Sequence, residues 1–276
     1  MNKKPVCLHF HIFKNAGSTV DGALARGFGR AFCAFDGPAP GSRIGPEAIL
    51  VHLRGHPSAK VLSSHQFRFP LPESARNTFH PVFFVRHPID RALSVYSFEK
   101  RQGGITPGSR MAEKYPIAEY IRRRLDQGVT TVVADFQTSL LSFGAGELPA
   151  RAVTAADRER AFGHLESAFV VGVVERLDES LVCAEEAFGN LFGPVDLACP
   201  PRNVSHDRAE TLVRRLEAGR HQLGLVLENE LNSRNKNDFT LHIRAGEELD
   251  RRIASLSGFE GKLAAFRERC ARIGRR

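Results

Sequence analysis

The sequence predicts an α/β fold in which a central parallel sheet is flanked by helices, with a helical C-terminal third. Apolar runs of strand length alternate with segments of helical periodicity in the first part of the chain, a pattern typical of parallel sheets. After residue 105 helical spacing dominates, apart from one later strand. The predicted strands are the apolar runs at 5–13, 59–65, 80–87 and 167–175.

Helices are predicted between and after these strands, at 18–28, 46–54, 88–100, 112–127, 154–166 and 176–192, with more in 205–276. In 88–100, Ile89, Leu93 and Tyr96 form one apolar stripe. Thr154 is placed to cap the helix that follows it.

We expect one domain over 1–276, because the Pro- and Gly-bearing loops at 36–46 and 103–108 lie inside the α/β pattern. The sheet core is assigned to 1–105 and 165–180, and the mainly helical parts are 106–164 and 205–276.

The composition is that of an ordinary globular protein, with 276 residues of which 42% are hydrophobic and 25% charged. The net charge of +8 favours anionic partners. We expect the short arginine clusters at 122–124, 214–215 and 251–252, and the terminal "RIGRR", to be solvated helix faces. Three tyrosines and no tryptophan argue against a single-stranded nucleic-acid partner.

We expect neither a signal-peptide core nor a membrane anchor at the start of the given sequence, because His9, His11 and Lys14 interrupt its apolar run. Five scattered cysteines fit reduced thiols. We therefore expect a cytoplasmic protein with no stable membrane insertion, and a homodimer is an open alternative to a monomer.

The first candidate site is "FKNAGST", where a strand ends and a helix begins. Backbone N–H groups at such a helix start, together with the cation of Lys14, suit a phosphate or sulfate. Gly17 allows close backbone approach, and Ser18 or Thr19 is placed to cap the helix. The Lys precedes the Gly, which is the wrong order for a Walker A loop.

The second candidate site is "RHPIDRALS", another strand-to-helix junction. Pro88 suits the first turn of a helix, and Arg91 and Ser94 are three residues apart on one helical face, opposite the apolar stripe. Arg86 can offer a bidentate contact to a second phosphate.

These two motifs together resemble those of the sulfotransferases that use 3′-phosphoadenosine 5′-phosphosulfate (PAPS), in particular the heparan sulfate 2-O-sulfotransferase-like carbohydrate branch. That family carries h-x-K-T-x-G-[TS]-[ST] and R-[DN]-P-x-x-R-x-x-S. Asn15 replaces the usual Thr of the first motif, and His87 replaces the acid or amide of the second. Three later segments, "DFQTSLLSFG", "VGVVERLDESL" and "PRNVSHDR", follow in the family's order, so the similarity extends over about residues 6–245.

The resemblance implies a P-loop-like three-layer fold and transfer of a sulfuryl group from PAPS to a hydroxyl of a saccharide or small glycoconjugate, releasing adenosine 3′,5′-bisphosphate. It assigns Lys14 to the leaving phosphate and Arg86 with Ser94 to the 3′-phosphate. The backbone amides of Asn15, Ala16, Gly17, Ser18 and Thr19 would hold the 5′-phosphosulfate. Arg202 and Ser205, in a late basic loop, are also placed at the nucleotide.

His65 is the candidate general base, because it follows a parallel strand whose C-terminal end reaches the same sheet edge as the phosphate loops. The alternative is that His65 only caps or hydrogen-bonds a loop. We expect the acceptor to contact the variable loops at 36–46, 66–78 and 103–118.

No metal site is expected, because His9 and His11 have no third ligand at sensible spacing, and a buried hydrogen-bonded pair is the favoured reading. Two other functions stay open. One is a nucleotide or small-molecule kinase, and the other is a non-catalytic module that binds nucleotides or polyanions.

Overall fold

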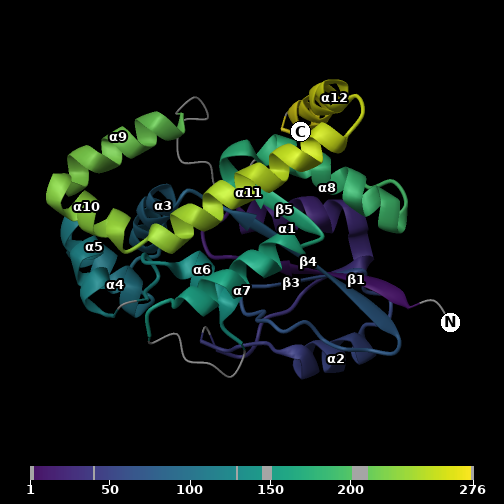
Figure 1. The fold of residues 1–276 in the computed structure, drawn as a ribbon, viewed down its shortest axis with the longest axis horizontal. Helices are drawn as coiled ribbons and strands as arrows, with labels where there is room; N and C mark the ends of the chain where they lie inside the picture. Colours follow the sequence, from purple (N-terminus) through teal and green to yellow (C-terminus); the bar gives the residue numbers. More distant parts are fainter. Residues whose placement is uncertain (1–2, 40, 129, 145–150, 201–210, 275–276) are drawn as a thin grey trace.

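The computed structural model describes residues 3–39, 41–128, 130–144, 151–200 and 211–274 (Figure 1). Its centre is a sheet of five strands in the order β2-β3-β1-β4-β5, and every neighbouring pair is parallel. The expected parallel sheet is therefore confirmed. The strands are β1 (Lys4–Phe10), β2 (Phe32–Ala34), β3 (Val61–Ser64), β4 (Asn77–Val85) and β5 (Val170–Val173).

Helices cover both faces of this sheet, and each predicted helical segment contains helix within the residues that the structure describes. Pro116 divides the expected helix at 112–127 into two, because proline restricts the residue before it to extended backbone. Short 3₁₀ turns lie at Gly29–Ala31 and Val174–Arg176. The helices are α1 (Gly17–Phe28), α2 (Pro46–Gly55), α3 (Pro88–Arg101), α4 (Pro107–Lys114), α5 (Ile117–Asp126), α6 (Phe136–Ser142), α7 (Ala155–Glu166), α8 (Leu177–Phe192), α9 (Leu212–Leu223), α10 (Leu225–Ser233), α11 (Lys236–Ser255) and α12 (Phe259–Ile273).

The alternation of side chains along the strands divides the core into two layers. Leu8 and Phe10 of β1 face the cluster made with α2, α6, α7 and α11. Cys7 faces the opposite cluster, made with α1, α8 and α12. The predicted three-layer α/β arrangement is thus confirmed.

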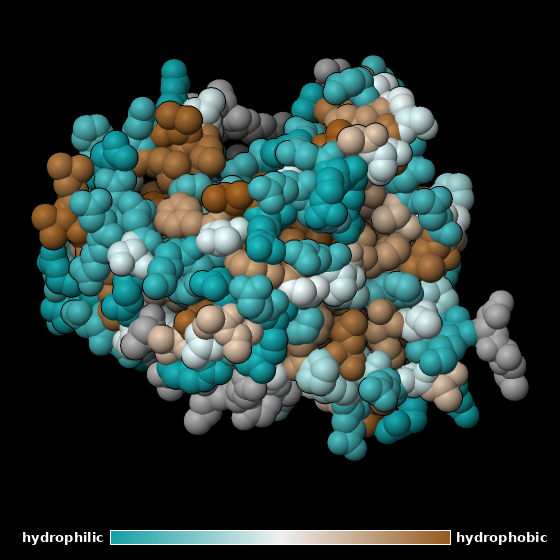
Figure 2. Space-filling model, in the orientation of Figure 1, coloured by the Kyte–Doolittle hydropathy of each residue, from teal (hydrophilic) through white to brown (hydrophobic). Residues whose placement is uncertain are grey.

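A third apolar cluster lies beyond the sheet and is built mainly from helices. Tyr96 of α3, Tyr120 of α5 and Leu231 of α10 are among its buried members. Figure 1 shows α4, α5, α9 and α10 grouped on the side of α3 away from the sheet. Figure 2 shows apolar side chains gathered on the outside of this group, where Leu225 and Val226 are exposed.

Strand β2 was not predicted, since its three residues are too short for a periodic signal. Thr154 caps α7 as expected and forms a reciprocal capping box with Asp157. Among the helices in the described ranges, none is both long enough and apolar enough to cross a membrane.

The expectation of solvated arginine clusters is wrong for one arginine in each of the clusters at 122–124, 214–215 and 251–252. Arg124 binds Glu99 at 2.8 Å, Arg215 binds Asp90 at 2.8 Å, and Arg252 donates to the carbonyl of Phe169 at 2.6 Å. The long apolar stem of arginine lets a residue at the edge of a helix face reach a buried partner. Adjacent positions on one helix therefore have different environments.

Candidate functional site

The candidate site lies at the C-terminal edge of the sheet. Strand β1 lies between β3 and β4, so the segments that follow these three strands meet there. The chain runs from β1 to one side of the sheet and from β4 to the other, which makes their junction a topological switch point. In open α/β sheets, ligands bind at such a crevice. Lys14, His65 and Arg86 each follow one of these strands.

The turn between β1 and α1 has an unusual backbone. Lys14 and Ala16 both have positive φ, at 66° and 57°. Non-glycine residues seldom adopt this left-handed conformation, and strained residues of this kind cluster at functional sites. Left- and right-handed residues in alternation point successive N–H groups into one concavity, which suits an anion.

Three N–H groups of this turn are available. Within the described ranges, the amides of Ala16, Gly17 and Ser18 have no hydrogen-bond partner. They lie at the positive end of α1, whose first turn leaves its N–H groups unpaired. The expected cradle is narrower than residues 15 to 19, because the amides of Asn15 and Thr19 already donate to Ile12 and Ala16 carbonyls.

The prediction that Ser18 or Thr19 caps α1 is wrong. The N-cap is Ala16, and no side chain caps the helix. Ser18 is exposed and Thr19 is buried. Because the left-handed Ala16 is the N-cap, the helix starts at Gly17, before either hydroxyl residue. The exposed Ser18 hydroxyl therefore faces solvent beside the unpaired amides.

Gly17 is required by close packing. A Cβ added there would lie 2.0 Å from Nε2 of His11. The imidazole of His11 therefore lies directly against the first residue of α1, and no larger residue fits without displacing it.

Lys14 has no acidic partner in the part of the chain that the structure describes. Its Nζ lies 4.4 Å from the centre of the Phe98 ring, a cation–π contact from α3. Burial, followed by the charges of Arg86 and Arg101, lowers the pKa of Lys14 to about 8. An ammonium group in cationic surroundings favours an added anion.

Arg86 joins the two predicted sites. Its Nη1 donates to the carbonyl oxygen of Lys14 at 2.9 Å, and its Nε donates to Asp90 at 2.9 Å. Asp90 is buried and also binds Arg215 of α9. Sequence reasoning missed Arg215, because the residues of this ion pair are 125 positions apart.

Ser94 lies in α3, half-buried, with no hydrogen-bond partner among the described residues. Ser94 comes one helical turn after Asp90 and so lies on the same face of α3 as Asp90, the residue that binds Arg86. Arg91 differs from the expectation: it is completely buried, with its guanidinium 4.7 Å from the Phe136 ring.

Gln137 of α6 is a second missed residue. Its amide oxygen accepts from the backbone N–H of Arg86 at 2.9 Å and from Nδ2 of Asn15 at 2.6 Å. Its Nε2 donates to the Arg86 carbonyl at 2.9 Å. One buried side chain therefore fixes the turns after β1 and β4 relative to each other. The segment "DFQTSLLSFG" carried the signal, through its resemblance to the sulfotransferases, but no single residue in it stood out.

His65 follows β3 and is exposed, with its Nδ1 2.9 Å from the carbonyl oxygen of His11. Since a carbonyl only accepts, Nδ1 carries the proton and Nε2 is left as an acceptor. The ring centre lies 3.7 Å from that of His11. Burial of this inner edge and the neighbouring His11 lower the pKa of His65. A neutral imidazole with a free Nε2 is the form that a general base requires.

His9 and His11 share Asp21 as a partner. Each Nδ1 lies 2.8 Å from a carboxylate oxygen of Asp21, so the predicted hydrogen-bonded arrangement is confirmed. Burial alone would raise the pKa of Asp21, but hydrogen bonds from His11 and His9 hold that pKa well below its usual range. The three residues have ligand atoms within 4.8 Å of one another and could hold a metal ion. Sequence spacing missed Asp21, which comes from α1.

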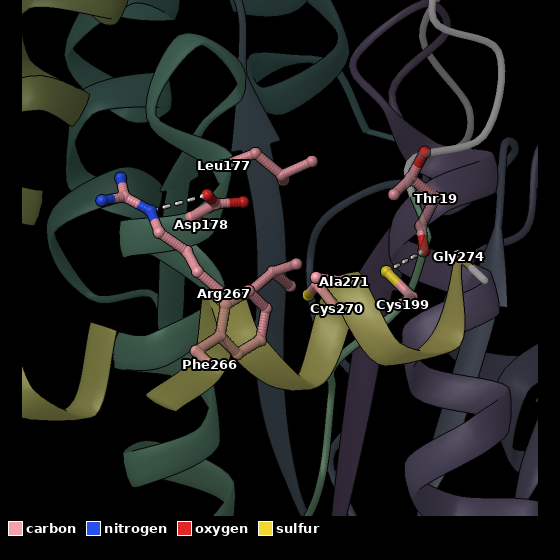
Figure 3. A pocket seen from close by; sticks show the side chains of 10 residues that line it. Thr19, Leu177, Asp178, Cys199, Phe266, Arg267, Cys270, Ala271 and Gly274 are labelled. Atoms are coloured by element: carbon pink, nitrogen blue, oxygen red, sulfur yellow. Dashed lines mark hydrogen bonds and ion pairs between the residues drawn. The ribbon is translucent and has the colours of Figure 1, made fainter. Parts of the chain in front are cut away.

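A pocket of about 580 Å³ lies beside the first turn of α1. Figure 3 shows Thr19 and Cys199 at one side of it, Asp178 and Arg267 at the other, and α12 along it. Its volume is within the range of small-molecule sites. Arg202 and Ser205, which were predicted at the nucleotide, lie outside the described residues.

Comparison with known proteins adds one relative. A protein of Archaeoglobus fulgidus, described as uncharacterized, is 27% identical over 241 residues, which cover 86% of this chain and 94% of that protein. No protein-family model matches this chain. The similarity to the archaeal protein extends well beyond the two strand-end motifs.

Proposed function

We propose that this protein transfers the sulfuryl group of PAPS to a hydroxyl group of a saccharide or small glycoconjugate. The observation that carries the proposal is the 2.9 Å hydrogen bond from Arg86 to the Lys14 carbonyl, which joins the two candidate phosphate sites at one sheet edge. A donor with phosphates at both its 5′ and 3′ positions matches two linked cationic turns. ATP has no 3′-phosphate and would use only one of them.

On the donor side, the free amides of Ala16, Gly17 and Ser18 would hold the 5′-phosphosulfate, and Arg86 with Ser94 would hold the 3′-phosphate. The pocket beside Thr19 offers room for the nucleoside. Lys14 would contact the oxygen that bridges phosphorus and sulfur and offset the charge that develops there.

In the reaction, the acceptor oxygen attacks sulfur in line with the bridging oxygen. The new S–O bond forms as the S–O bond to the 5′-phosphate breaks, and adenosine 3′,5′-bisphosphate leaves with the electron pair. The proton of the acceptor hydroxyl passes to Nε2 of His65. His11 acts as a positioning residue, since its carbonyl fixes the tautomer of His65.

The proposal is tested by thermal unfolding with adenosine 3′,5′-bisphosphate, ATP and 5′-AMP. At about a hundredfold excess over Kd, a ligand stabilises the native state by about 2.7 kcal/mol. For a chain of this size the bisphosphate should then raise Tm by about 5 °C. ATP and AMP should raise it much less. Equal or absent responses to the three nucleotides would contradict the proposal.

Ser94→Ala gives the matched variant, because the Ser94 hydroxyl has no hydrogen-bond partner among the described residues, whereas Arg86 also bonds the Lys14 carbonyl and Asp90. It should lower the bisphosphate response toward that of AMP and leave the AMP response nearly unchanged. Transfer of labelled sulfate from PAPS across a panel of saccharides, lipids and phenols then identifies the acceptor class.

A further inference from the structure

A small pocket near His65 contains two arginines that form no ion pair within the described residues. Its volume is about 180 Å³, and we call it the arginine pocket. We call the turns after β1 and β4, which carry Lys14 and Arg86, the donor turns. Helix α6 lies between them and the pocket: its Gln137 bonds to the donor turns, while its Phe136 and Ser139 line the pocket. Its lining residues are Arg43, Arg68, Thr130, Thr131, Val132, Phe136, Ser139, Leu140 and Phe143.

Backbone pairing brings the two arginines together. Ile44 and Phe67 form an isolated parallel bridge, in which the N–H of Arg68 donates to the Ile44 carbonyl at 3.0 Å. Arg43 and Arg68 therefore come from adjacent extended segments. Holding two half-buried cations close to each other is unfavourable unless an anion joins them.

The described parts of the chain supply no such anion. Neither Arg43 nor Arg68 forms an ion pair there, and the guanidinium of Arg68 is bonded only to the backbone carbonyls of Phe67 and His65. Burial and the neighbouring charge of Arg43 lower the pKa of Arg68 to about 10.

A third arginine lies behind the pocket wall. Arg91 donates to the carbonyl of Val132 at 2.7 Å and stacks its guanidinium on Phe136, and both of these residues line the pocket. Its Nε and Nη1 are buried without a hydrogen-bond partner in the described structure. Arg91 and the two arginines of the pocket thus place three buried or half-buried positive charges there, and the nearby Asp238 offsets part of the Arg91 charge.

The pocket also adjoins the proposed base. Nη1 of Arg68 lies 3.4 Å from the carbonyl oxygen of His65. A volume of about 180 Å³ is smaller than the usual drug-sized site, so it fits one end of an acceptor and not an extended chain.

We propose that the arginine pocket binds a single anionic group, a carboxylate or a phosphate monoester, of a short acceptor, and so places a nearby hydroxyl at His65. This inference rests on the proposed sulfuryl transfer for its role, but the anion site itself does not depend on it. The two arginines suit either anion, since guanidinium groups bind both in bidentate geometry. The aromatic rings of Phe136 and Phe143 would pack on the part of the acceptor next to that group.

The test measures binding by calorimetry without any donor, at constant ionic strength. The probes are methyl β-glucuronide for the carboxylate, glucose 6-phosphate for the phosphate, and methyl β-glucoside as a neutral sugar. At least one acidic probe should bind about tenfold or more tightly than the glucoside, the effect of a charge-assisted hydrogen bond. The stronger of the two acidic probes identifies the anion.

Arg43→Gln and Arg68→Gln should each weaken binding of that probe about tenfold or more and leave the glucoside unaffected. Arg43→Lys keeps the charge without the planar fork and should have an intermediate effect, and it serves if Arg68→Gln fails to fold. The matched control is Arg54→Gln, which removes an exposed arginine from α2 and should change nothing.

The proposal is overturned if the glucoside binds as tightly as both acidic probes, if no probe binds, or if Arg54→Gln weakens binding as much as the pocket variants do. The thermal response to adenosine 3′,5′-bisphosphate is recorded for every variant. Acid binding without that response would remove the proposed function alone, and the response without acid binding would remove the arginine pocket alone.

Discussion

The donor turns and the arginine pocket occupy the same end of the sheet but are assembled differently. Lys14 and Arg86 each lie within a short motif that directly follows a strand, and one hydrogen bond links the two motifs. The arginine pocket instead takes its lining from separate segments between residues 43 and 143. A nucleotide shared by many enzymes can be bound by a compact local motif, whereas an acceptor specific to one enzyme is bound by residues that only the tertiary fold brings together.

The largest expected effects are on kcat, and nucleotide affinity then distinguishes the donor turns from the acceptor side. Lys14→Ala should lower kcat about 10³-fold, because it removes the charge opposite the leaving phosphate. His65→Ala should lower kcat about 10²-fold or more through loss of the base. Adenosine 3′,5′-bisphosphate affinity, measured by calorimetry, should fall in the Lys14 variant and stay nearly unchanged in the His65 variant.

Ser97→Ala provides a control on α3, since among the described residues its exposed hydroxyl bonds only the helix carbonyl of Leu93. It should retain both turnover and nucleotide affinity. Substantial turnover in Lys14→Ala would remove the proposed role of that residue, and weakened nucleotide binding in His65→Ala would place His65 on the donor side.

Sequence reasoning found the parts of this site whose signal is local. The spacing of Lys14, Gly17, Arg86 and Pro88 predicted both strand-to-helix turns, because the physics of a helix start depends on neighbouring residues. The cap of α1 was predicted wrongly, since a left-handed alanine leaves no trace in residue propensities.

The missed residues act over long sequence separations. Gln137 bonds to Asn15 across 122 positions, and Arg215 bonds to Asp90 across 125. Neither residue type is unusual in its local setting, so no periodicity or motif marks them. The loops at 36–46 and 66–78, which contain Arg43 and Arg68, were expected at the acceptor, but neither arginine stood out until the bridge between the two segments was known.

Helix α6 should support both the donor turns and the arginine pocket, and a substitution in α11 tests this. Asp238 of α11 is buried and accepts from the N–H groups of Gln137 and Thr138 and from the Thr138 hydroxyl. Asp238→Ala leaves these three donors unsatisfied and should destabilise the fold by about 3 kcal/mol, measured by urea unfolding. It should also weaken binding of both nucleotide and acidic sugar, because Gln137 and the pocket wall belong to one helix.

Asp250→Ala is the matched control. It lies on the same helix, its side chain is 65% exposed, and it pairs with Arg176 at the surface. Its effect on stability should stay within about 0.5 kcal/mol. If Asp238→Ala affected only one of the two ligands, α6 would not be the common support.

The smallest effects are expected in the pH dependence of kcat/KM, which reports the free enzyme. Lys14 must be protonated to offset the leaving-group charge, so activity should fall as pH rises through its pKa of about 8. His65 must be neutral to accept a proton, so activity should fall as pH drops below its pKa, which burial and His11 hold below the usual histidine value. Arg101→Gln removes a charge that lowers the pKa of Lys14 and should move the alkaline limb to higher pH, leaving the acid limb in place. Arg54→Gln should move neither limb. The assignment would be contradicted if the alkaline limb stayed in place in Arg101→Gln and disappeared in His65→Ala. The group whose deprotonation lowers activity at high pH would then be His65, on the acceptor side, and not Lys14.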